Sequence, residues 1–374
     1  MKVSLLSENL QEKLLLVNHA ISSRSQLPIL LNVLIKTEKK MLSISGTDLE
    51  IGIKTEVPAN IEEEGGTTVP AKTFSELIGT IPAGKIIIET TQGGIALTGK
   101  GLRSIFQTTK AEEFPKLYEE TKEETAIISR KEIEKNFPRV VFAASQDQTR
   151  PALSGVLIKE KKDEGGFFIV ATDGYRLSLQ KIILEKKGKL EKEGLMIVPS
   201  RAIRELILLS KGDDGVRVYS SSESNQVIFC QNDTTLVGRL IEAEFPMYEK
   251  IIPIDFSTRT IFEKDELQRA IKAAYVFAKS SANIVKLSIK KEKIVVYVNA
   301  PSVGENTVEV EAKTTGEENE IAFNARYLLD LFSNIEEESM VFEMTGPLNP
   351  GVFKIAGDDS FLHLIMPIRV QQES

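Results

Sequence analysis

The chain is poor in the residue types that most often carry catalysis and cross-linking. It has one cysteine, Cys230, and two histidines, His19 and His363, among 374 residues. A single cysteine allows no internal disulfide, which fits a reducing, cytoplasmic environment. These three side chains cannot build a zinc site of the usual kind. The sequence therefore gives little support to thiol, disulfide or zinc chemistry.

Several sequence signatures are also absent. No apolar run approaches the roughly 18 residues of a membrane-spanning helix, and the apolar stretch in residues 1–8 is too short for a secretory signal. The two glycine-rich phosphate-binding motifs, G-x-x-x-x-G-K-[ST] and G-x-G-x-x-G, do not occur, and the nucleophile-elbow motif G-x-S-x-G does not occur either. A metal or acid–base site built only from Asp and Glu remains possible, although charged runs such as 160–164 are typical of solvated turns. We expect a non-enzymatic protein with no cofactor and no membrane partner.

What the chain does contain is a threefold repeat. Its length exceeds what one hydrophobic core usually supports, so two or three domains are expected. The first recurring landmark is an apolar trio spaced i, i+4 and i+7, which lies on one face of a helix. The trios are Leu10, Leu14 and Val17; Ile133, Phe137 and Val140; and Leu267, Ile271 and Ala274.

Two further landmarks recur at the same interval. An extended segment opens a second helix at Pro70, Pro199 and Asn324. Proline suits the first helical turn, and asparagine is a favoured N-cap. A strand followed by proline ends the repeats at Pro115, Pro246 and Pro367. The separations are 129 and 125 residues for the former landmark and 131 and 121 for the latter, so the period is near 125 residues.

The segments between these landmarks have the pattern of strands. Short runs of β-branched and aromatic residues occupy 156–158, 167–170 and 294–298. Glycine pairs at 65–66, 93–94 and 165–166 separate such runs as turns. The pattern predicts an α+β fold in which each repeat has two helices embedded in antiparallel strands. We expect three homologous domains at 1–122, 125–253 and 255–374.

The charge is unevenly distributed. The net charge of −7 argues against nucleic acid as a partner. However, the expected helical stretches 7–24, 71–80 and 324–334 are neutral, whereas 130–150, 200–211 and 264–279 carry +2 each, which leaves −13 for the remainder. A ring with basic helices inside and acidic sheets outside would explain this split, and would bind DNA weakly and without sequence preference. For any single helix, a solvated face explains the charge equally simply.

Five segments resemble a known family. Residues 150–157 and 171–178 resemble the middle domain of the bacterial DNA polymerase III β sliding clamp family, as do 244–253 and the terminal 365–370. Residues 24–30 resemble the family's first domain. The resemblance implies the DNA clamp fold, with a head-to-tail dimer that closes a ring of twelve inward helices around duplex DNA. It also implies a processivity factor, whose partners are the replicative polymerase, the clamp loader and other proteins with a clamp-binding motif.

The resemblance implies a peptide-binding pocket between the second and third domains. In such a pocket, apolar side chains bury an anchor while polar ones orient the partner. Its expected residues are Arg150, Leu153, Thr172, Gly174, Tyr175, Arg176, Leu177, Pro246, Lys250, Ile251, Asn324, Tyr327, Leu348, Leu364, Ile365, Met366, Pro367, Ile368 and Arg369. Two positions depart from the family pattern. Tyr175 replaces a frequent histidine, and Lys250 stands where some members have an arginine, whose bidentate fork lysine cannot form.

Two more sites follow from the resemblance and from helix charge. Arg24 and Gln146 match family positions at the DNA, and we add Lys72, Arg201, Arg204 and Lys279 from their place on the expected helices. Phe106 matches a position in the subunit interface of the homodimer, with Val276 and Phe277 as its expected partners. Ordinary core packing of Phe106 and ordinary solvation of the basic residues remain open.

Two other functions remain open. A β-rich scaffold could bind peptides without enclosing DNA, and it would tolerate reversed charge on the helices. A carboxylate-based enzyme, such as a metal-dependent nuclease, would require magnesium or manganese and would lose turnover when one acidic cluster is neutralised.

Overall fold

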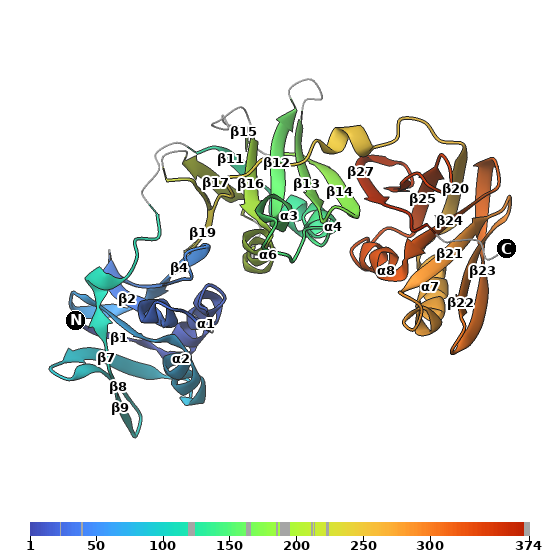
Figure 1. Ribbon diagram of the computed structural model, residues 1–374. Helices are drawn as coiled ribbons and strands as arrows, with labels where there is room; N and C mark the ends of the chain where they lie inside the picture. Colours follow the sequence, from blue (N-terminus) through green and yellow to red (C-terminus); the bar gives the residue numbers. More distant parts are fainter. Residues whose placement is uncertain are drawn as a thin grey trace. The chain divides into compact units, whose positions relative to one another are not determined.

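The computed structural model describes the chain apart from residues 23, 39, 119–123, 162–165, 185, 188–194, 211, 213, 222–223 and 370–374. The chain forms two compact units (Figure 1). The first comprises Met1–Ile133, Leu184–Gly194 and Arg201–Leu240, and the second Glu134–Ile183, Leu195–Ser200 and Ile241–Ser374. The middle repeat therefore supplies strands to both units. The expected domain limits at 122 and 374 lie outside the described residues.

The first unit holds two antiparallel sheets. The five-stranded sheet has the order β5 (Asn60–Glu63), β1 (Lys2–Leu6), β7 (Lys85–Thr91), β8 (Gly94–Gly99) and β9 (Leu102–Phe106). The ten-stranded sheet has the order β10 (Thr109–Lys110), β6 (Gly66–Pro70), β2 (Asn32–Glu38), β3 (Met41–Thr47), β4 (Ile51–Pro58), β19 (Thr234–Arg239), β18 (Gln226–Gln231), β17 (Val216–Ser221), β11 (Ala126–Ile128) and β15 (Lys186–Lys187). Pairing of β4 with β19 makes one continuous sheet from strands of the first and middle repeats.

The first predicted helix pair packs as expected. Helix α1 (Ser7–Asn18) buries the whole of its apolar trio, which confirms the i, i+4, i+7 reading. Helix α2 (Ala71–Thr80) lies beside it, and the Asn18 side-chain amide donates to the Ser75 hydroxyl over 3.0 Å. Short 3₁₀ turns, η1 (Pro28–Leu31) and η2 (Ala111–Glu113), complete this repeat.

The second unit is built on a twelve-stranded antiparallel sheet. Its order is β16 (Leu195–Pro199), β12 (Gly155–Lys161), β13 (Gly166–Thr172), β14 (Arg176–Ile182), β27 (Asp358–Ile365), β26 (Gly351–Ile355), β25 (Ser339–Met344), β20 (Thr258–Glu263), β23 (Gly304–Gly316), β22 (Lys293–Ala300), β21 (Ile284–Ile289) and β24 (Asn319–Asn324). The three strand runs predicted from sequence lie in β12, β13 and β22. Pairing of β14 with β27 joins the middle repeat to the third, in register from Arg176↔Ile365 to Gln180↔Phe361.

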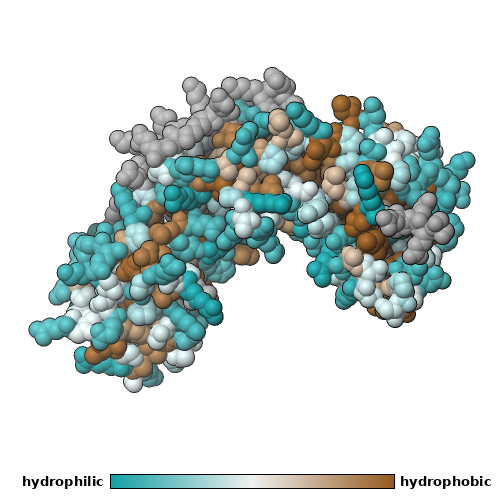
Figure 2. Space-filling model, in the orientation of Figure 1, coloured by the Kyte–Doolittle hydropathy of each residue, from teal (hydrophilic) through white to brown (hydrophobic). Residues whose placement is uncertain are grey.

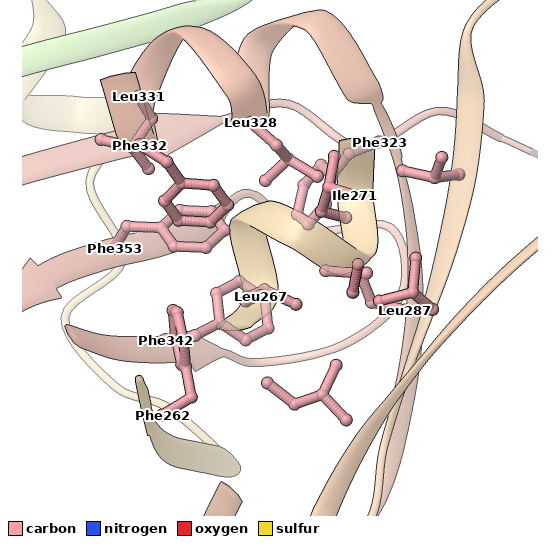
Figure 3. Close-up of a cluster of buried hydrophobic side chains, with 14 of the residues drawn as sticks. Phe262, Leu267, Ile271, Leu287, Phe323, Leu328, Leu331, Phe332, Phe342 and Phe353 are labelled. Atoms are coloured by element: carbon pink, nitrogen blue, oxygen red, sulfur yellow. The ribbon is translucent and has the colours of Figure 1, made fainter. Parts of the chain in front are cut away.

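The third repeat has a core rich in phenylalanine. Helices α7 (Lys264–Ala278) and α8 (Ala325–Ser333) lie together over this core (Figure 3). The rings of Phe342 and Phe353 lie 4.7 Å apart between centroids, and Phe323 meets Phe342 edge-on at 6.1 Å. Each buried ring contributes roughly 1.5–3 kcal/mol, so this core fixes the strands that carry the end of the chain.

The helical part of the middle repeat differs from the expectation. The trio Ile133, Phe137 and Val140 is buried as predicted. However, it is divided between α3 (Arg130–Asn136) and α4 (Pro138–Val141), because Pro138 has no N–H to continue the helical ladder. A short α5 (Pro151–Ser154) follows, then α6 (Ser200–Leu209) and the 3₁₀ turn η3 (Tyr248–Ile251).

The proline landmarks also lie slightly outside their predicted places. Pro70 and Pro199 end the strands before α2 and α6, so they precede the first helical turn and do not occupy it. Asn324 is the N-cap of α8 as predicted, and its side-chain oxygen accepts from the Arg326 N–H over 3.0 Å. Of the predicted glycine turns, Gly165 lies outside the described residues. No described helix is long and apolar enough to cross a membrane.

Candidate functional site

A tight turn between β13 and β14 forms one edge of the expected pocket. Gly174 has φ +92°, a conformation that favours glycine. One Asp173 carboxylate oxygen accepts from the N–H groups of Tyr175 and Arg176 over 2.9 and 3.0 Å. The Thr172 hydroxyl donates to the Arg176 carbonyl and accepts from the Gly174 N–H. The turn is therefore fixed by its own side chains and presents Tyr175 at its tip.

Beneath this turn, the β14–β27 pair supplies an apolar floor. Leu177 is opposite Leu364 in the ladder, and both are fully buried. They share an apolar cluster with Leu157, Val170, Ile197, Phe245, Tyr248 and Val352. The cluster draws on both the middle and the third repeats. Leu177, Leu364 and Ile365 are therefore buried core residues beneath the expected pocket and do not line its surface.

The rim of the pocket is exposed and apolar. Tyr175 is 60% exposed and Met366 38% exposed. Their backbones are joined, because the Met366 N–H donates to the Tyr175 carbonyl over 2.8 Å. Ile251 and Met247 are also exposed, on the segment that contributes Phe245 and Tyr248 to the floor. On the face drawn in Figure 2, apolar patches likewise lie among hydrophilic residues.

The remaining expected residues come from several segments of the second unit. Pro246 and Lys250 are exposed, just before and three residues after Met247 in the chain. Leu153 is half-buried and lies in α5. Pro367 and Ile368 are half-buried, and the Ile368 N–H donates to the Ala322 carbonyl, which brings the end of the chain beside β24. Leu348 is exposed in the loop before β26, and the Thr345 hydroxyl at the start of this loop donates to the Asp255 carbonyl.

Three of the expected pocket residues are exposed cations. Arg150, Lys250 and Arg369 all have exposed side chains. The Arg150 guanidinium lies 4.0 Å from the place that a Cβ on residue 174 would occupy. A positively charged rim favours partners with acidic or polar acceptor groups.

The side chain of Arg176 is less exposed than its predicted role suggested. We expected it to orient the partner, but its side chain is only 10% exposed. Its guanidinium binds the carboxylates of Asp173 and Asp330 and the carbonyl of Phe142. Asp330 and Phe142 were not predicted as its partners, because both are distant from residue 176 along the chain.

Tyr327 lies at the same junction. Its ring centroid is 4.7 Å from the Arg176 guanidinium carbon, a cation–π distance. Burial of the hydroxyl, aided by the Asp173 carboxylate, raises the pKa of Tyr327. Asn324 is one turn earlier in sequence, and its side-chain oxygen is occupied by the cap of α8. Only its amide nitrogen therefore remains as a donor to a partner.

The residues expected at DNA fall into two groups. Arg24 and Lys72 of the first unit, and Gln146 and Lys279 of the second, are exposed. Lys279 lies 5.0 Å above the Tyr275 ring. These side chains are accessible to a phosphate backbone.

Arg201 and Arg204 are less accessible. The Arg201 guanidinium pairs with Asp48 and donates to the His19 carbonyl over 2.8 Å. Arg204 is half-buried, and burial lowers the pKa of its guanidinium. Their contribution to an external positive field is therefore smaller than the sequence count suggested.

Two other cations that were counted in the charge of the expected helices are also buried. Arg139 is 2% exposed and pairs with Glu337. The Lys264 ammonium is buried and donates to the Ile335 carbonyl over 2.9 Å. Formal charge per helix thus overstates the charge available to DNA, because the sequence does not show which cations have acidic partners.

Phe106 is not exposed in the single chain. It is 8% exposed, and its ring packs edge-on against Phe74 at 5.3 Å, so within one chain it packs in the core, and its role in the subunit interface stays a prediction. The exposed apolar residue on β9 is its neighbour Ile105, at 57%. On α7, Val276 is exposed and Phe277 half-buried. The predicted subunit interface keeps Val276 as an accessible apolar residue, and Ile105 joins it as a candidate.

No group of three or more His, Cys, Asp or Glu side chains among the described residues is arranged to hold a metal ion.

Comparison with known proteins covers nearly the whole chain. Three family models match: DNA polymerase III beta subunit, N-terminal domain, at residues 1–118; central domain, at 127–247; and C-terminal domain, at 249–369. The beta sliding clamp of Synechococcus elongatus is 28% identical over 99% of this chain and all of its own length. That of Staphylococcus aureus is 28% identical over 94% of each chain.

Solved structures agree in fold. The DNA polymerase sliding clamp of Bacillus subtilis is similar with a TM-score of 0.93 and 27% identity, covering 99% of this chain and 100% of that one. The DNA polymerase III beta subunit of Thermotoga maritima gives a TM-score of 0.89 and 26% identity at the same coverage. These likenesses extend over all three repeats, and the fold is the three-domain clamp fold.

Proposed function

The chain belongs to the DNA polymerase III beta subunit family, and we propose that it is a sliding clamp that tethers a replicative polymerase to duplex DNA in the cytoplasm. Two copies associate head to tail into a closed ring around the duplex. The ring catalyses no reaction. Its effect is topological, because a ring on DNA keeps a bound polymerase at high effective concentration near the template.

One observation carries the proposal beyond family membership. The β14–β27 junction forms an apolar floor under an exposed rim of Tyr175 and Met366, with the cations Arg150, Lys250 and Arg369 nearby. A short peptide with an apolar anchor and polar flanks fits such a site. The proposed partners are the polymerase, the clamp loader and other proteins that carry a clamp-binding motif.

The proposed DNA contact is weak and indifferent to sequence. Exposed Arg24, Lys72 and Lys279, with Gln146, offer contacts to phosphates, and such contacts carry no sequence information. Association with DNA should therefore fall steeply with salt, and a loaded clamp should move along the duplex.

Retention on circular DNA tests the ring. The protein is loaded onto nicked circular plasmid with its cognate clamp loader and ATP, and the plasmid is then gel-filtered before and after linearisation. A ring stays with the circle and leaves the linear form through its ends. Equal retention on both forms would instead support a scaffold that does not enclose DNA. Light scattering in parallel should give twice the 41.5 kDa of one chain; a mass fixed at that of one chain would contradict the dimer.

Peptide binding tests the pocket. We expect Met366→Ala to weaken binding of a fluorescein-labelled peptide from the cognate polymerase by at least about tenfold, because an exposed apolar anchor is lost. Leu208→Ala, which truncates an exposed leucine on α6, is the matched control and should bind normally. Leu177 is a poor probe, since its truncation would open a core cavity and cost about 2–5 kcal/mol. Normal binding by Met366→Ala would contradict the pocket.

A further inference from the structure

Four side chains stack beneath the proposed pocket. The Arg176 guanidinium carbon lies 4.7 Å from the Tyr327 ring centroid and 5.4 Å from that of Phe142. Phe142 in turn stacks on the His363 ring at 5.3 Å with an interplanar angle of 29°. Tyr327 and His363 belong to the third repeat, whereas Arg176 and Phe142 belong to the middle one. The stack therefore ties the two repeats together under the pocket.

Hydrogen bonds fix the guanidinium within this stack. Its Nε donates to Asp173 over 3.0 Å, its Nη1 to Asp330 over 2.6 Å, and its Nη2 to the Phe142 carbonyl over 3.1 Å. All three nitrogens are thus engaged, from three different segments of chain. A planar guanidinium can meet three such acceptors at once, and an ammonium cannot reproduce this geometry.

The same contacts connect to the rim. Asp173 receives Arg176 with one carboxylate oxygen, while the other holds the N–H groups of the turn that presents Tyr175. Asp330 lies on α8, one helical turn after Tyr327. Displacing the guanidinium would therefore loosen both the turn and the Tyr327 ring, which are two walls of the pocket.

We propose that Asp330 and Phe142 are positioning residues of the partner pocket: they hold Arg176, and Arg176 holds the Asp173–Tyr175 turn and the Tyr327 ring in the geometry that the partner requires. This inference rests on the proposed function, because it assumes that the pocket binds a partner peptide. Neither residue needs to touch the peptide. Their effect on affinity passes through the guanidinium.

A double-mutant cycle tests the inference. Full-length wild type, Asp330→Asn, Arg176→Lys and the double variant are titrated into the fluorescein-labelled polymerase peptide, and their melting temperatures are measured in parallel. Each single variant should lose about fivefold in affinity, and the double should lose little more than either one, since residues that act as a unit are not additive. Asp330→Glu keeps the carboxylate and should recover most of the affinity. Glu309→Gln, which breaks an exposed ion pair with Lys293, is the control and should bind as wild type.

The outcomes separate the inference from the function on which it rests. If wild type does not bind the peptide, the proposed partner pocket fails, and the inference with it. If wild type binds and Asp330→Asn binds equally well, the positioning role is wrong while the pocket stands. Additive losses would mean that Arg176 meets the peptide directly. A lower affinity that only parallels a lower melting temperature, with no recovery in Asp330→Glu, would reduce Asp330 to a structural residue.

Discussion

Removing the Arg139 side chain should destabilise the second unit. Arg139 is 2% exposed, and its guanidinium pairs with Glu337. It also donates to Asn136 over 3.3 Å and to Gln180 over 3.2 Å. Gln180 lies on β14, so this network supports the strand that carries Arg176. Arg139→Met keeps an apolar stem of similar length but leaves the acceptors without their donor.

The magnitude follows from the environment of Glu337. Breaking a buried ion pair by removing one partner typically costs about 3–5 kcal/mol, because the remaining charge is uncompensated. Glu337 retains 26% exposure and has the Lys135 ammonium 3.4 Å away, and both reduce the penalty. We therefore expect about 3 kcal/mol, at the lower end of that range. Replacing Glu337 as well, by leucine, removes the orphaned carboxylate and should recover about 2 kcal/mol.

Hydrogen exchange of the β14 amides is the suitable assay, because unfolding of a multi-domain chain is not described by a single free energy. The opening free energy of these amides should fall in Arg139→Met and partly recover in Arg139→Met/Glu337→Leu. A loss below about 1 kcal/mol in the single variant would refute the buried-pair reasoning. Equal losses in the two variants would show that the lost hydrogen bonds to Asn136 and Gln180, and not the orphaned Glu337 carboxylate, weaken β14.

Other perturbations have equally definite expectations. Burial, with the Arg176 charge, holds the pKa of His363 in the folded chain well below 6.5. As the pH falls through 6.5, the unfolded chain therefore binds more protons than the folded chain does. Stability should therefore be full above this pH and decline toward pH 5, and His363→Gln should flatten the decline in hydrogen exchange of β27; an unchanged slope would exclude His363 as its source. Gly174→Ala imposes a strained φ of +92° and should cost about 1–2 kcal/mol and weaken peptide binding. Gly357→Ala, at φ +77° in the β26–β27 turn, should cost as much stability with no loss of binding; equal binding losses would mean that the effect is not local to the pocket.

Local patterns predicted local structure well. The apolar trios of α1 and α7 are buried because a 3.6-residue period leaves one face for the core, whatever that core contains. The helix of the middle repeat was predicted as continuous, and Pro138 divides it. Its trio is nonetheless buried, because the side-chain spacing survives the interruption.

Pairings between distant residues could not be predicted. Arg176 meets Asp330 across 154 positions and Arg139 meets Glu337 across 198. Nothing in the local sequence distinguishes these arginines from the exposed Arg150. The charge count over helices overstated the exposed positive charge for the same reason, since it included cations that the fold pairs internally. The sequence likewise left open whether Phe106 packs in its own core, because its contact with Phe74 of α2 joins distant segments.

The location of the proposed pocket follows from the way the repeats join. In both units, a strand of the middle repeat pairs with a strand of its neighbour, β19 with β4 and β14 with β27. Such pairing removes an exposed sheet edge. Because β14 and β27 are antiparallel, the start of β14 and the end of β27 lie at the same end of the pair. The turn before β14 and the residues after β27 therefore meet there, with Tyr175 bonded to Met366. Tyr175 and Met366 keep their large apolar side chains on the surface there, over the buried Leu177 and Leu364. A peptide bound as proposed would cover them and add apolar contact without disturbing the ladder, so partner binding and the joining of the two repeats would not conflict.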